Sequence, residues 1–163
     1  MRKSTIGTFL MFIALAFLSN FSTAYAQSCN SELSVINNRD ARSASENDPT
    51  QFQIEILNNS SSSQRYYIEV ANYDGIFNIK GKKPPRLNSN YDLNVLIYQN
   101  NSQNTMIIVP ARSTANFQVA VSVPIGTPIN RWGGLEVKAI NDACPDGAVS
   151  TLLKLFVADP NEE

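Results

Sequence analysis

The stretch that decides the fold class is residues 116–123, which read NFQVAVSV. Phe117, Val119, Val121 and Val123 alternate with smaller or more polar residues, so they share one face of an extended chain. Three of these four side chains are β-branched, which also favours a strand. The stretch therefore predicts a β-strand with one buried face.

The same period of two recurs along most of the chain, and no segment shows sustained helical periodicity. Further strands are expected at residues 50–57, 65–71, 92–98, 135–140 and 149–157, with shorter ones at 32–36, 76–80 and 105–109. Turn-rich segments separate them. Many short strands at near-regular spacing predict an all-β protein, an antiparallel sandwich of seven to nine strands in two sheets, with an up-and-down barrel as the main alternative.

The first 26 residues have the three parts of a secretory signal peptide. A basic start is followed by the apolar residues 6–18 and by an A-x-A site that ends at Ala26. The apolar part is shorter than the roughly 20 residues of a membrane anchor. We expect cleavage between Ala26 and Gln27, leaving residues 27–163 as a single β-sandwich domain without a membrane span. The product is expected in the periplasm, at the cell surface or outside a bacterium; a lipoprotein acylated at Cys29 is the alternative.

Two cysteines in an exported protein predict one disulfide, Cys29–Cys144, and two unpaired thiols are the alternative. Successive turns of a sandwich alternate between its two ends. The turn that holds Cys144 joins the last two strands, so it meets the start of the first strand when the number of strands is odd. The predicted bridge would then clamp the N-terminus to the final hairpin.

Composition excludes several kinds of chemistry. The chain has no histidine, which removes every His-dependent triad, metal ligand and proton shuttle. Sequence motifs for a nucleophilic serine or a phosphate-binding loop are also missing, so no catalytic residue, cofactor or metal is expected. The formal net charge is −1, without the polybasic face that nucleic acids require. Asp40, Glu46, Asn47 and Asp48 lack the spacing of known calcium loops and are interpreted as a polar loop.

Two features are candidates for binding a partner. A basic cluster could dock an acidic protein or anionic lipid headgroups, although a solvated loop explains it too; it consists of Lys80, Lys82, Lys83 and Arg86. Trp132 could be an exposed stacking platform, but a plug between the sheets or a partly buried rim residue is favoured. Five tyrosines allow a carbohydrate-binding interpretation that β-propensity explains as well; they are Tyr66, Tyr67, Tyr73, Tyr91 and Tyr98.

Four segments resemble a known group of domains: FQIEILNN at 52–59, YIEV at 67–70, IVPARST at 108–114 and FQVAVSVP at 117–124. The pattern resembles bacterial exported immunoglobulin-like domains of the NEW3 and CARDB type, and is similar to the C-terminal periplasmic domain of cytochrome oxidase accessory proteins. The resemblance implies an immunoglobulin-like sandwich that acts as a spacer or interaction module. This chain departs from the pattern in its cysteine pair and in a long insertion at residues 80–90.

The first functional hypothesis is therefore a non-enzymatic, exported immunoglobulin-like module that binds a protein partner or a cell-envelope component. A structural pilus-like or surface subunit is the second; it would need an exchangeable strand, and the strand expected at 149–157 argues against it. A small carbohydrate-binding module is the third, and exposed aromatic side chains gathered on one face would favour it.

Overall fold

The structure is a computed structural model that describes residues 30–77 and 92–161. In these ranges the chain forms ten strands and one short 3-10 turn, and no α-helix. The elements are β1 (Ser31–Val35), η1 (Ile36–Asn38), β2 (Ala41–Ala44), β3 (Thr50–Asn58), β4 (Gln64–Asn72), β5 (Asn94–Gln99), β6 (Ser102–Gln103), β7 (Met106–Val109), β8 (Ser113–Ser122), β9 (Arg131–Asn141) and β10 (Cys144–Val157).

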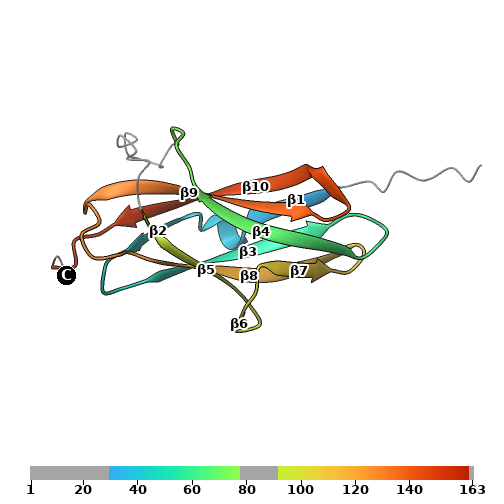
Figure 1. Cartoon of the computed structure of the whole chain (residues 1–163), viewed down its shortest axis with the longest axis horizontal. Helices are drawn as coiled ribbons and strands as arrows, with labels where there is room; N and C mark the ends of the chain where they lie inside the picture. The colour runs from blue at the N-terminus through green and yellow to red at the C-terminus, as the bar shows by residue number, and fades with distance from the viewer. Residues whose placement is uncertain (1–29, 78–91, 162–163) are drawn as a thin grey trace, which may run out of the picture.

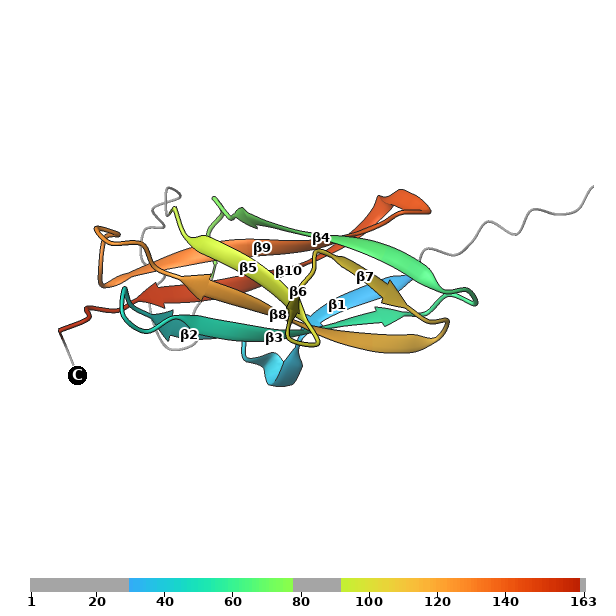
Figure 2. The same cartoon turned by 60° about the horizontal axis from the view of Figure 1, so that its bottom comes forward.

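The strands build two five-stranded sheets that pack face to face in an elongated sandwich (Figures 1 and 2). Sheet A has the order β1-β3-β8-β5-β6, and sheet B has the order β2-β10-β9-β4-β7. All neighbours are antiparallel except β2 and β10, which run parallel. The protein is thus an all-β, immunoglobulin-like β-sandwich, which confirms the predicted fold class.

The ten strands of the described ranges make only seven passes along the sandwich. β1 and β2 are two parts of one pass that changes sheets. β5 and β7 are two parts of another, and the two-residue β6 between them pairs with β5 and makes no pass of its own. Because seven is odd, the start of β1 and the start of β10 lie at the same end, as Figure 1 shows. Cys144 is the first residue of β10, and the described part of the chain holds no free cysteine. Cys29 lies outside the described residues, so the Cys29–Cys144 bridge stays a prediction.

The core lies between the sheets and consists mainly of the apolar side chains at alternate positions along the strands. Phe52, Ile54 and Ile56 of β3 are fully buried, and Phe117, Val119 and Val121 of β8 lie beside them. Sheet B contributes the buried side chains of Tyr66, Ile68, Ile107, Val109, Leu135, Val137, Leu153 and Leu155. Full burial of one such side chain stabilises the fold by about 1.5–3 kcal/mol.

A buried polar network closes the sandwich at the end of β3. Asn58 is fully buried, and its Nδ2 donates hydrogen bonds to the carbonyl oxygens of Val109 and Pro110, both at 3.0 Å, and of Ser62 at 2.8 Å. Its Oδ1 accepts from the backbone N–H of Ser60 at 3.0 Å and from the Ser60 hydroxyl at 2.7 Å. One side chain therefore ties sheet A to the end of β7 in sheet B.

The structure corrects three predictions about where strands lie. Ile76 and Phe77, which begin the strand expected at 76–80, are not in a strand, and the rest of that segment lies outside the described residues. Phe77 instead packs over Gly134 of β9, where a Cβ atom would come within 2.9 Å of its ring. β2 lies inside the segment interpreted as a polar loop. β9 begins at Arg131 and not at residue 135 as predicted, because its ladder with β10 extends to Val157.

Candidate functional site

The outer face of sheet B carries a group of exposed apolar side chains next to β7. Tyr67 is 41% exposed, Met106 37% and Ile108 54%. The strand register gathers them: Tyr67 lies opposite Met106 on one side and opposite the half-buried Ile140 on the other. We call Tyr67, Met106, Ile108 and Ile140 the β7 patch. Single exposed apolar residues are ordinary, but a contiguous group of them is a candidate interaction surface.

Local sequence explains why these side chains face outward. In β7 the four residues MIIV are all apolar, so alternation sends Ile107 and Val109 into the core and leaves Met106 and Ile108 outside. In β4 the same rule buries Tyr66 and exposes its neighbour Tyr67. An uninterrupted apolar run in a strand with one solvent-facing side is the sequence signal for this patch, because a period of two alone accounts only for the buried side chains.

β7 is also the last strand of sheet B, so one side of its backbone has no partner strand within the described ranges. The N–H of Ile68 in β4 donates to the carbonyl of Thr105 at 2.8 Å. In an antiparallel ladder the backbone N–H and C=O groups of successive residues point alternately toward the partner strand and away from it. The backbone groups of Ile107 and Val109 therefore also point toward β4, whereas those of Met106 and Ile108 point away from it. No charge or proline interrupts β7, although such residues usually protect edge strands.

Charged residues surround the β7 patch. Arg65 lies opposite Ile108 across the β4–β7 ladder, and its guanidinium forms an ion pair with Asp142 at 3.3 Å. Both side chains of this pair are about half exposed, so it contributes little to stability. Glu69 lies opposite Lys138, which forms an ion pair with Glu136. An apolar centre with a charged rim is the arrangement typical of protein–protein interfaces.

Of the residues singled out from the sequence, Tyr67 belongs to this patch, whereas the basic cluster and Trp132 do not. Lys80, Lys82, Lys83 and Arg86 lie outside the described residues. Trp132 is half-buried on the outer face of sheet B, where its ring centroid lies 5.3 Å from that of Phe156. Of the two favoured interpretations of Trp132, the plug between the sheets is wrong, whereas a partly buried position agrees with the structure. Alternation buries Leu135 instead and turns Trp132 outward. It is eight residues from Ile140 along β9, or roughly 26 Å at strand spacing.

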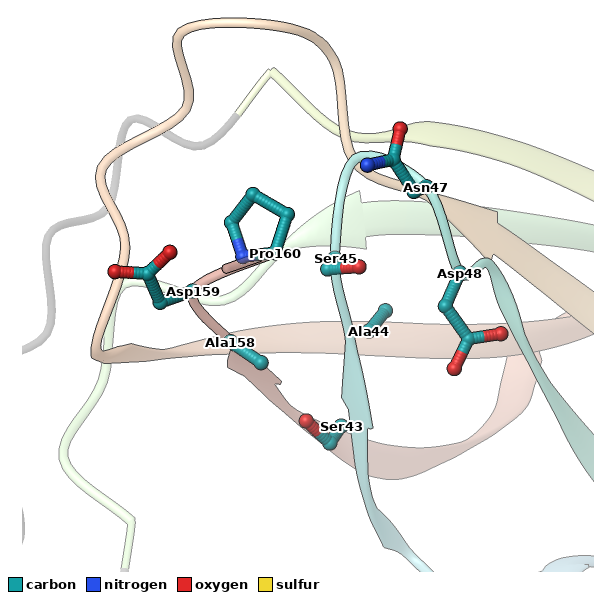
Figure 3. A pocket seen from close by; sticks show the side chains of 8 residues that line it. All are labelled: Ser43, Ala44, Ser45, Asn47, Asp48, Ala158, Asp159 and Pro160. Carbon is teal, nitrogen blue, oxygen red and sulfur yellow. The ribbon is translucent and has the colours of Figure 1, made fainter. Parts of the chain in front are cut away.

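The acidic residues near β2 contact different partners and do not form one cluster. Asp40 accepts a hydrogen bond from the ammonium group of Lys154 at 2.6 Å, and Glu46 accepts one from the backbone N–H of Gly126 at 2.7 Å. Asp48 and Asn47 line a pocket of about 320 Å³ between the β2–β3 turn and the C-terminal segment. Figure 3 shows Asp48 and Asp159 on opposite sides of this pocket, with carboxylates that do not converge. Within the described ranges no group of three or more acidic or Cys side chains could hold a metal ion.

The tyrosines are distributed over several surfaces. Tyr66 is in the core, Tyr67 is in the β7 patch, and the ring of Tyr73 lies against Gly75. Tyr98 is on the outer face of sheet A, and Tyr91 lies outside the described residues. They do not form the single aromatic face that would favour a carbohydrate-binding module of the stacked-platform kind.

Comparison with known proteins finds similarity in fold but not in sequence. No family model and no curated protein matches the sequence. Among solved structures, a FixG-related protein from Vibrio parahaemolyticus is similar over 79% of this chain and 96% of its own, with 11% identity and a TM-score of 0.51. A family 123 glycoside hydrolase from Clostridium perfringens is similar over 80% of this chain but only 27% of its own, with 7% identity and a TM-score of 0.50.

A third similar structure is the E. coli chaperone DraB, with 13% identity, a TM-score of 0.46 and coverage of 82% of this chain and 57% of its own. At these identities the similarities concern the fold alone. Among the described residues, none lies in a helix of the length and apolar character that a bilayer crossing requires.

Proposed function

We propose that this protein is a non-enzymatic immunoglobulin-like module that binds a protein partner through the β7 patch. The observation that carries the proposal is the gathering of Tyr67, Met106 and Ile108 at an uncharged strand edge. Aromatic residues, Met and Arg are enriched at protein interfaces. The β7 patch with its neighbour Arg65 offers all three kinds of residue, and this composition supports a protein over a charged ligand as the occupant.

The geometry of β7 supports a partner segment in the extended conformation. An added strand would pair with the outward backbone groups of Ile108, and its alternate side chains would cover the β7 patch. Such a segment would be uncharged and apolar at every second position. β10 supports this function over a strand-exchanging structural subunit, because it pairs with β2 and β9 in the interior of sheet B.

Site-specific photo-cross-linking tests the binding surface. We expect a photoreactive amino acid at position 108 to cross-link one defined protein in the envelope of the native host. The matched control is position 125, because Ile125 is 91% exposed on a turn between β8 and β9, outside the β7 patch. Equal cross-linking from both positions would contradict the proposal.

Substitution of the same residue gives a second test. The variant Ile108→Lys should weaken binding of the cross-linked partner by at least about tenfold, or ~1.4 kcal/mol, because the lysine ammonium group would lose water on docking. The variant Ile125→Lys should bind normally. Unchanged affinity of Ile108→Lys, measured by calorimetry, would exclude this surface.

We further propose that the protein is exported and processed between Ala26 and Gln27. The basic, apolar and A-x-A parts of residues 1–26 support this route. A relationship to domains of the NEW3 and CARDB type is a separate proposal, which rests on the four sequence segments that resemble them. N-terminal sequencing of protein from native cells should begin at Gln27. A retained leader or an acylated Cys29 would show a different route.

A further inference from the structure

We infer that the outer face of sheet A binds a neutral oligosaccharide across Tyr98. Two adjacent hollows carry this inference, of about 330 Å³ and about 240 Å³, and Tyr98 lines both of them. The site lies on the sheet opposite to the β7 patch, so it is independent of the proposed protein-binding function.

The strand register builds the floor of this site. Gln53 of β3, Gln118 of β8 and Tyr98 of β5 lie side by side in one row across sheet A. Asn116 is the next outward residue of β8, and the β5–β6 turn brings Asn100 and Asn101 to the same hollow. Both turn residues have left-handed backbone angles, with φ of 52° and 63°, which asparagine tolerates better than most residues.

The amide groups of the first hollow are available for a ligand. Within residues 30–77 and 92–161, the side chains of Gln53, Gln118, Asn116, Asn100 and Asn101 have no hydrogen-bond partner. An amide side chain both donates and accepts hydrogen bonds. A sugar hydroxyl also does both, so a row of amides matches a polyhydroxylated ligand.

The charge and the shape of the two hollows further restrict the class of ligand. No charged side chain lines either hollow, which disfavours anionic sugars, phosphates and metal ions. The second hollow continues along β5 past Asn94 and Leu96. Outward residues of one strand recur about every 7 Å, so the two hollows together fit linked rings rather than one small molecule. The Tyr98 ring between them can contact the apolar face of a sugar.

A nuclear magnetic resonance titration of the mature protein tests the inference. The probes are cellohexaose, xylohexaose, mannohexaose and maltohexaose, each at about 10 mM, which detects a Kd in the millimolar range. At least one of them should shift the side-chain amide resonances of Gln53, Gln118 and Asn116. If none of the four does so, the inference is overturned. An equal response to an anionic oligogalacturonate would overturn the neutral-ligand assignment.

Variants then locate the site. Tyr98→Ala should weaken binding of the responding sugar by about tenfold. Tyr67 is an exposed tyrosine of sheet B, so Tyr67→Ala should leave the affinity for the sugar unchanged. Gln118→Ala removes a surface amide without altering the core, so its weaker binding would support the inference even if Tyr98→Ala failed to fold. Equal losses in Tyr98→Ala and Tyr67→Ala would overturn it. Cross-linking from position 108 is unaffected by any of these outcomes, so the two proposals fail separately.

Discussion

The variant Asn58→Ala should lose about 3 kcal/mol of the free energy of unfolding, because several buried polar groups at the end of β3 each lose a hydrogen bond. The carbonyl oxygens of Val109 and Pro110 would lose their shared donor, and the N–H of Ser60 would lose its acceptor. Each buried group left unsatisfied costs about 1–3 kcal/mol. Chemical denaturation of the mature protein measures the loss.

The neighbouring residue supplies the control. Asn59 is exposed, and its side chain makes only a long contact to Glu32, so Asn59→Ala should change stability by less than about 0.5 kcal/mol. Asn58→Asp keeps the side-chain shape but removes the Nδ2 donor, so it should be destabilised like Asn58→Ala. Stability near that of the wild type in Asn58→Asp would show that packing, not hydrogen bonding, makes Asn58 important.

The variant Cys29→Ser should lower the free energy of unfolding by about 2–4 kcal/mol, the typical effect of losing a disulfide. The predicted bridge would close a loop of 115 positions, which strongly restricts the unfolded chain. β1 should loosen first, because it is a five-residue edge strand whose one partner strand in the described ranges is β3. Hydrogen exchange should therefore rise in residues 31–35 before it rises elsewhere.

The partner cysteine provides a strict check on this prediction. Because one bond needs both sulfur atoms, Cys144→Ser should lose the same free energy as Cys29→Ser, and the double variant should lose no more than either single one. Additive losses, or exchange in β1 that does not respond to reduction of the wild-type protein, would contradict a Cys29–Cys144 bridge.

Local pattern was sufficient to locate most strands. Every predicted strand except the one at residues 76–80 is confirmed, because alternating polarity records which side of a strand is buried. β2 was missed because its four residues ARSA lack the β-branched and aromatic side chains that mark strands. It forms because parallel pairing with β10 satisfies its backbone, with Lys154 opposite Ala41.

The candidate sites were much harder to predict. Tyr67 and Met106 are far apart in the sequence, and only the β4–β7 register places them side by side. The role of Asn58 was equally hidden, since a buried and an exposed asparagine follow each other at positions 58 and 59 with no difference in local pattern.

The sequence by itself determined the all-β class and the faces of the strands, because both depend on neighbouring residues; the proposed export route rests on the sequence alone. Only the tertiary structure decided which strands lie at the sheet edges, that Asn58 reaches Pro110, and that Tyr98 stands among amides from β3 and β8. These properties depend on sheet order and register. Both are set by the summed packing of strands that are distant in the chain, which no local pattern records.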